Sequence, residues 1–227
     1  MTTIKVDARA VFVLSRFISQ VPIGRRISGI LVEHDPDSHG VILTATDGHT
    51  LGTWRDQSGV IDGPSVVLAT NAKMIAACKP RKVGEIGRTL SADVEGVIVS
   101  KVFARAEKSV FEQKRLTDGA ASFVHDVAFP DWRRVVPDLS EEGKIPHGFN
   151  ARYLGRFDID PNSEAGCGIQ MRTAGGEGPV VVFVSGCDEF LGVIMPMRER
   201  KDDPKSDHWF FAKADEAADA KPKKKSA

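Results

Sequence analysis

The chain has 227 residues, of which 41% are hydrophobic and 27% are charged, which is enough for one large domain or two small ones with a core. Its 31 Lys and Arg residues balance 31 Asp and Glu residues, so a uniformly basic coat for nucleic acid is excluded, whereas a local basic face is not. The chain has no membrane-length apolar run, no signal-peptide pattern and no paired spacing of its three cysteines, so we expect a cytoplasmic protein without membrane contact or disulfide framework.

The first sixty residues predict a strand, a helix and three further strands. A β-rich run at residues 3–6 precedes Asp7, a residue type that caps helix N-termini. Apolar residues then recur at helical spacing from Val11 to Ile18, and Pro22 follows where the helix should end. Three short β-rich runs come next, and Asp-Pro and Asp-Gly turn signals separate them.

The same order of elements returns twice. A second strand and helix, capped by Thr70 or Asn71, precede three strands, and a strand at 147–150 and a helix capped by Asn150 precede three more. The three strand–helix–three-strand units span residues 1–60, 63–125 and 145–200. A period near sixty residues indicates internal structural repetition.

This repetition predicts an α+β protein of repeated β-α-β-β-β units, with short helices on one face of antiparallel sheets. The predicted parts are a two-unit domain at 1–125, a linker at 126–144, a third unit at 145–200 that forms part of a second domain, and a tail at 201–227. Pro130 and Pro137 favour extended backbone in the linker. The charged composition of the tail predicts disorder around its one apolar cluster, Trp209-Phe210-Phe211.

A search for catalytic or metal-binding motifs finds none with the required spacing. The chain has no nucleophile elbow, phosphate-binding loop or dinucleotide fingerprint. Calcium-loop patterns that start at Asp35 and Asp158 lack the closing acid, because Thr46 and Ile169 stand there. The histidines lack zinc-ligand spacing. We therefore predict a protein that is not an enzyme and has no cofactor, with a nuclease on a β-rich scaffold as the enzymatic alternative.

The three predicted helices share a charge pattern, because their cores contain basic residues and no acidic ones. The candidate DNA-facing residues are Arg9, Arg16, Lys73, Lys79, Arg81, Lys82, Arg152 and Arg156. Helices that lie side by side on one sheet face would gather these residues into a basic stripe, which follows phosphates without reading bases. The alternative is that they are ordinary helix-surface residues.

Three groups of segments resemble the bacterial DNA polymerase III beta subunit, the sliding clamp. They are ISGIL at 27–31 with TATDGHTL at 44–51, FPDWRRVVP at 129–137, and GFNARYL at 148–154 with VIMPMR at 193–198. In that family, six domains of paired units form a ring around duplex DNA, with basic helices lining the hole. The first two units here resemble the clamp's middle domain, and the third resembles the second half of its last domain. A chain with three units would need four copies to supply the twelve units of such a ring.

The resemblance also implies a hydrophobic pocket for short linear motifs. One wall comprises Ile27, Thr46, Gly48, His49, Thr50 and Leu51, with Pro130 and Val135 beneath, and the other comprises Val193, Met195, Pro196, Met197 and Arg198. Thr50 stands where the family usually has a basic residue, and Trp132 where it has tyrosine. The two methionines suit a pocket for several partners because their side chains adapt. The alternative for Met195-Pro196-Met197 is an edge strand that closes the core. The alternative for His49 is a residue of the turn rather than of the pocket rim.

By this resemblance, the chain is expected to be a processivity factor that encircles duplex DNA and tethers the replicative polymerase through the pocket. Its expected partners are duplex DNA of any sequence, a DNA polymerase, a clamp loader and further copies of itself in a homo-oligomeric ring. The shortened chain suggests a phage or prophage type. The alternative is an interaction module that binds clamp-binding motifs without encircling DNA.

Overall fold

The chain divides into two compact parts, Met1–Pro196 and Met197–Ala227. The computed structural model describes residues 2–19, 29–80, 85–93, 96–105, 108–118, 123–124, 129–140, 143, 148–160 and 166–198. All helices and strands of these residues lie in the first part. The predicted tail lies outside the described residues, and so do three predicted site residues, Ile27, Arg81 and Lys82.

The first unit begins with a strand that runs directly into a helix. Its elements are β1 (Thr3–Asp7), α1 (Ala8–Leu14), the 3-10 helix η1 (Ser15–Phe17), β2 (Ile30–His34), β3 (Val41–Thr46), β4 (Thr50–Asp56) and the short β5 (Val60–Asp62). Asp7 caps α1 as predicted, because its carboxylate accepts the Arg9 N–H at 2.8 Å.

The second unit follows the same order of elements, and the third follows it from the helix onward. The second comprises β6 (Val66–Leu68), α2 (Ala72–Cys78), β7 (Glu85–Asp93), β8 (Gly96–Arg105), β9 (Lys108–Asp118) and β10 (Phe123–Val124). The third comprises α3 (Ala151–Leu154), the 3-10 helix η3 (Gly155–Phe157), β11 (Ile169–Arg172), β12 (Val180–Val184) and β13 (Phe190–Ile194). Asn71, rather than Thr70, caps α2, and Asn150 caps α3. The predicted α+β class of antiparallel sheets with few short helices is confirmed.

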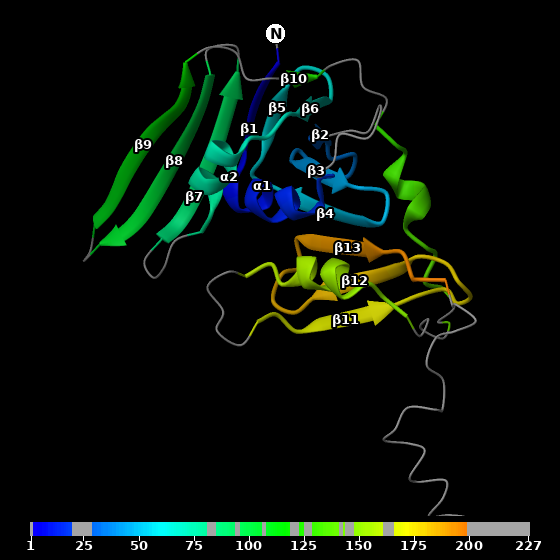
Figure 1. Cartoon of the computed structure of the whole chain (residues 1–227). Coiled ribbons are helices and arrows are strands. Elements are labelled where there is room, and N and C mark those ends of the chain that lie inside the picture. The colour runs from blue at the N-terminus through cyan, green and yellow to red at the C-terminus, as the bar shows by residue number, and fades with distance from the viewer. Residues whose placement is uncertain are drawn as a thin grey trace, which may run out of the picture. The chain divides into compact units, whose positions relative to one another are not determined.

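The first two units interlock by exchanging their first strands. β1 pairs with β7 of the second unit, and β6 pairs with β2 of the first, so each sheet holds strands of both units. The resulting strand orders are β5-β1-β7-β8-β9 and β10-β6-β2-β3-β4-β13-β12-β11, with all pairs antiparallel (Figure 1). α1 contacts strands of both sheets and packs against α2, and its side chains from Ala8 to Leu14 are mostly buried.

The third unit joins the first through a direct strand pair. β13 runs antiparallel to β4, with Gly192 opposite Gly52. The Phe17 ring covers Gly52, the Phe157 ring covers Gly192, and the two ring centroids are 5.4 Å apart. We call this strand pair with its two glycines the seam. Because glycine has no side chain, both rings lie directly against the sheet and contact each other. This contact links η1 to η3.

Two predicted segments differ in the structure. The strand predicted at 147–150 is absent from its described residues, 148–150, because these pair with no described strand. The predicted extended linker contains a 3-10 turn, η2 (Trp132–Val135). That turn forms because the Asp131 C=O accepts the Arg134 N–H at 3.3 Å, and the Asp131 carboxylate pairs with the Arg134 side chain at 2.9 Å.

Candidate peptide-binding pocket

The floor of the candidate site lies on the face of the seam opposite the phenylalanine rings. Successive residues of a strand point to opposite faces, so Leu51 and Val193, which adjoin the glycines, point away from Phe17. Strand register places Thr46 opposite Leu51, and Leu51 opposite Val193. Three strands from two units therefore supply one row of side chains. Leu51 and Val193 are buried.

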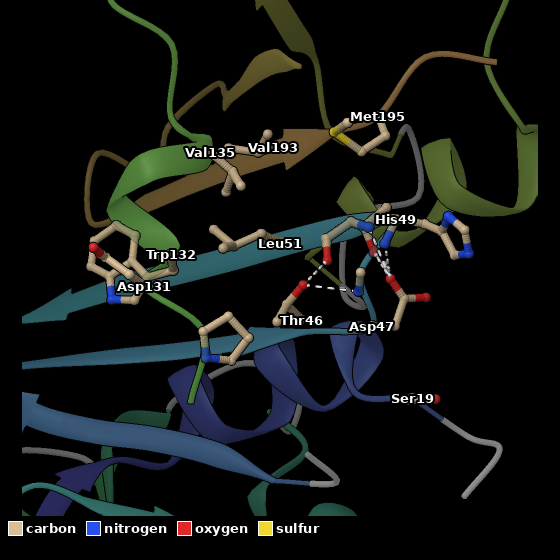
Figure 2. Close-up of a pocket in the computed structure, with 13 residues that line it drawn as sticks. Ser19, Thr46, Asp47, His49, Leu51, Asp131, Trp132, Val135, Val193 and Met195 are labelled. Atoms are coloured by element: carbon tan, nitrogen blue, oxygen red, sulfur yellow. Dashed lines mark hydrogen bonds between the residues drawn. The ribbon is translucent and has the colours of Figure 1, made fainter. Parts of the chain in front are cut away.

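A pocket of about 360 Å³ lies over this row. Its lining residues are Ser19, Thr46, Asp47, Gly48, His49, Thr50, Leu51, Pro130, Asp131, Trp132, Val135, Val193 and Met195. Figure 2 shows Leu51, Val193 and Val135 near its middle, with Trp132 toward one end and Met195 toward the other. Val135 and Met195 are each 40% exposed, so apolar surface remains available to a ligand.

The wall formed by η2 is held by polar contacts to β2. The Trp132 indole N–H donates to the Glu33 carboxylate at 3.0 Å, and the Arg133 guanidinium pairs with Glu33 at 2.9 Å. The same guanidinium lies over the Trp132 ring, 4.3 Å from its centroid. Glu33 thus positions both side chains and fixes the wall against the sheet.

The opposite wall is an extension of the seam. The Met195 N–H donates to the His49 C=O at 2.9 Å, which continues the β4–β13 pairing by one bond. The His49 ring stacks on Tyr153 of α3, with centroids 5.3 Å apart and planes at 16°. The third unit therefore supports this wall from its helix as well as from its strand.

The turn between β3 and β4 is tied down by Asp47. Its carboxylate accepts the N–H groups of His49 at 2.9 Å and Thr50 at 2.8 Å. Arg156 pairs with Asp47 at 2.7 Å and donates to the Thr50 hydroxyl. Gly48 has a φ of 87°, a backbone conformation that favours glycine. Burial alone would raise the pKa of Asp47, but these donors outweigh it and hold the pKa below its ordinary value.

Asp47→Asn is expected to lower the free energy of unfolding at neutral pH by about 1–2 kcal/mol, because charge-assisted bonds to the turn and to Arg156 are lost. A lowered folded-state pKa gives stabilisation that is full above about pH 4 and disappears as the pH falls through that pKa. Urea unfolding should therefore show a gap between the two proteins at neutral pH that narrows in acid. Asp62→Asn, at an exposed aspartate, is the control. An equal gap at both pH values would contradict this role.

The structure brings together nine of the residues predicted for the pocket. They are Thr46, Gly48, His49, Thr50, Leu51, Pro130, Val135, Val193 and Met195. Pro196 is not among the lining residues, whereas Met197 and Arg198 belong to the other compact part of the chain, so their place in the pocket stays a prediction. Ser19, Asp47, Asp131 and Trp132 line the pocket but were not predicted to do so. Three of these four lie within segments that the resemblance singled out, whereas Ser19 carries no signal in the sequence.

No protein-family model matches the chain, and no curated protein matches its sequence. Solved structures do match. The sliding clamp (DNA polymerase III subunit beta) of Bartonella birtlesii bound to griselimycin is 18% identical, with a TM-score of 0.51 over 87% of this chain and 66% of its own. The Helicobacter pylori beta clamp bound to a DNA ligase peptide is 15% identical, with the same TM-score and coverage. The Pseudomonas aeruginosa DNA polymerase III subunit beta is 13% identical, with a TM-score of 0.51 over 87% of this chain and 67% of its own.

The chain has the sliding-clamp fold. This confirms the fold that the resemblance implied. The chain spans 66% of the length of the first two clamps, just under two thirds.

The predicted basic residues of this clamp fold have different surroundings. Lys73, Lys79 and Arg152 are exposed. Three others are half-buried and contact the chain itself: Arg9 lies over Trp54, Arg16 donates to the Asp158 C=O and lies over Phe12, and Arg156 pairs with Asp47. The side chains of Lys73, Lys79 and Arg152 are thus more exposed than those of the other described candidates.

Other site types find no support in the part of the chain that the structure describes. Among these described residues, no group of three or more His, Cys, Asp or Glu side chains could hold a metal ion. No helix among the same residues has the length and apolar character needed to cross a bilayer. The pocket is therefore the site on which we base a function.

Proposed function

We propose that the chain is a non-enzymatic sliding clamp, which encircles duplex DNA and tethers a DNA polymerase through a short peptide bound in the pocket. The observation that carries this proposal is the apolar pocket at the seam of a clamp fold. The clamp of Helicobacter pylori, which shares the fold, is bound to a DNA ligase peptide. That complex supports a peptide as the occupant of this pocket.

The pocket has the properties of a groove for apolar side chains. Leu51 and Val193 form a buried floor, while Val135 and Met195 stay partly open to solvent. A leucine or phenylalanine of a peptide would bury these surfaces, and such anchors carry most of the affinity of an interface. Met195 is unbranched and polarizable, so it can adapt to different partners, including polymerase and loader motifs.

Tethering then follows from topology and effective concentration. A closed ring stays on DNA because it cannot dissociate sideways, and basic helices allow sliding with little base preference. A polymerase held in the pocket remains at a high local concentration near the primer end. A ring built from this chain would contain several copies, and four copies of three units each would supply the twelve units of six paired-unit domains.

The proposal is tested by retention on closed circular DNA after treatment with or without a linearising nuclease. A ring loaded with the host's clamp loader should stay on the circle and slide off the linear product, and a fluorescent peptide with a leucine–phenylalanine motif should bind in solution. Peptide binding without any retention on circles would favour the alternative, an interaction module that does not encircle DNA. Loss of both properties would contradict the proposal.

Exposed helix cations are expected to supply part of the DNA affinity. Lys73→Glu or Arg152→Glu should each weaken DNA association, and each should lower the slope of log affinity against log salt by about one, since a phosphate contact is lost. Lys5→Glu, an exposed charge on β1, is the matched control. Filter binding across a salt series measures the slopes. Equal slopes in all variants would show that these helices do not face DNA.

A further inference from the structure

The first compact part of the chain ends at the rim of the pocket. Met195 lines the pocket, and Pro196, the next residue, is the last of that part. The remaining chain, Met197–Ala227, therefore begins two residues after a side chain of the candidate site. Its sequence can be compared with what the pocket is built to bind.

The predicted tail at 201–227 carries all of its large apolar side chains in one place. Trp209, Phe210 and Phe211 are consecutive, and the tail contains no Val, Ile, Leu or Met. An aromatic side chain buries about 150–250 Å² when water is excluded from it. The cluster is thus an apolar anchor within a segment of charged, polar and small residues, and burial against an apolar surface would stabilise it.

The pocket is the surface best suited to cover such a cluster. Among the described residues of the first part, the exposed large hydrophobic residues are Val60, Val135, Ile169 and Met195. Val135 and Met195 line the pocket together, whereas Val60 on β5 and Ile169 on β11 are not among its lining residues. Single exposed apolar residues are ordinary on a protein surface. At the pocket, exposed apolar side chains and a cavity coincide.

The side chains of the pocket also suit aromatic rings. Figure 2 shows Trp132 toward one end and Met195 toward the other. A methionine sulfur makes favourable contacts with ring edges, and an indole pairs with a second aromatic ring. Trp132 is already held by its hydrogen bond to Glu33. Less conformational entropy is therefore lost at this wall when a ring binds.

The connection between Met195 and the cluster is long enough for the cluster to return to the pocket. Trp209 follows Met195 by 14 positions. A flexible chain of that length has a root-mean-square end-to-end distance of about 20 Å and a fully extended reach of roughly 45–50 Å. A connection this short gives an attached ligand an effective concentration on the order of 1 mM.

We infer that the Trp209-Phe210-Phe211 cluster occupies the pocket of its own chain, as an internal ligand that a partner peptide must displace. The inference rests on the proposed function, because it requires a pocket that binds apolar peptides. An internal ligand weakens external binding by a factor of one plus its effective concentration divided by its Kd. A Kd on the order of 0.1 mM would make this factor about ten. Weakly binding peptides would then be excluded from the pocket.

Peptide binding by the full-length chain tests the internal ligand. The aromatic variant combines Trp209→Ser, Phe210→Ser and Phe211→Ser, and the control combines Ala217→Ser, Ala218→Ser and Ala220→Ser, which add the same number of serines to the tail. A fluorescein-labelled peptide of residues 205–214 should bind the aromatic variant about tenfold more tightly than wild type, because its pocket is open. The control should bind like wild type. Fluorescence anisotropy is measured at chain concentrations well below the Kd of the tail, so that tails of other copies leave the pocket open.

A second substitution locates the binding of this peptide. Met195→Lys, added to the aromatic variant, should weaken binding of the 205–214 peptide at least tenfold, because a charge in the pocket must be desolvated. Ile169→Lys, added to the same variant, should leave that binding unchanged. Equal affinity of wild type and the aromatic variant for the 205–214 peptide would overturn the internal ligand. Binding that is insensitive to Met195→Lys would overturn it as well.

The peptide with a leucine–phenylalanine motif reports the proposed function separately. If it binds wild type and the aromatic variant with equal affinity, the internal ligand is wrong and the pocket keeps its proposed role. If it binds neither protein while the 205–214 peptide behaves as expected, the internal ligand stands and the proposed external partner is wrong. Tighter binding of both peptides by the aromatic variant supports the two proposals together.

Discussion

Met195→Lys is expected to weaken binding of an apolar peptide at least tenfold, whereas Ile169→Lys should leave it unchanged. Met195 lines the pocket and is 40% exposed, so a lysine there can reach solvent without unfolding the chain. Its charge must be desolvated when a peptide covers it, and that cost opposes binding. Ile169 on β11 is similarly exposed, at 38%, and is not among the residues that line the pocket. Fluorescence anisotropy with one labelled peptide compares the two variants with wild type.

Ile169→Lys is the matched control because it adds the same charge at an apolar side chain that is exposed to a similar degree. Leu51 is a poorer choice for this test, since it is 3% exposed and lysine there would disturb the floor and the fold together. Val135→Lys, on the facing wall, should reproduce the effect of Met195→Lys. Equal peptide affinity of Met195→Lys and Ile169→Lys would contradict peptide binding at this pocket.

Features that depend on neighbours in the sequence were predictable. Asp7 and Asn150 were recognised as helix caps because a cap is made by a side chain and the N–H groups that follow it within three residues. The Asp47-Gly48 turn was recognised for the same reason, since its bonds join residues 46–50. Periodicity of apolar residues then located the helices and most strands.

Features that depend on distant residues were not predictable from local pattern. The pairing of β4 with β13 joins segments more than 130 positions apart, and only the family resemblance placed both on one pocket. Arg156 was assigned to a basic stripe, but its partner Asp47 is 109 positions away. Trp132 contacts Glu33 across 99 positions. In each case, the contact exists because the third unit or the linker docks on the first unit, which no local propensity specifies.

Gly192→Ala is expected to destabilise the protein by about 2 kcal/mol, or roughly 4–8 °C in Tm. A Cβ at this position would lie 2.3 Å from Phe157 Cε1 and 2.8 Å from Phe157 Cδ1. The Phe157 ring has no room to withdraw, because it is fully buried and packs against Phe17 and Phe190. The added methyl group must therefore displace either the ring or β13. Thermal unfolding monitored by circular dichroism gives the shift.

Gly155→Ala provides the control for the chemistry of the change. No atom lies within 4 Å of a Cβ at Gly155, and its φ of −62° suits alanine, so this variant should be as stable as wild type or slightly more stable. Gly52→Ala tests the other half of the seam, because its Cβ would lie 2.8 Å from Phe17 Cδ2. The Phe17 and Phe157 rings share one space between η1 and η3, so one alanine already separates them. The double variant, Gly52→Ala with Gly192→Ala, should therefore lower the free energy of unfolding by less than the sum of the two single variants. Full stability of Gly192→Ala would show that the third unit does not depend on close contact between Phe157 and the seam. That contact could then not be what shapes the pocket floor on the other face of the seam.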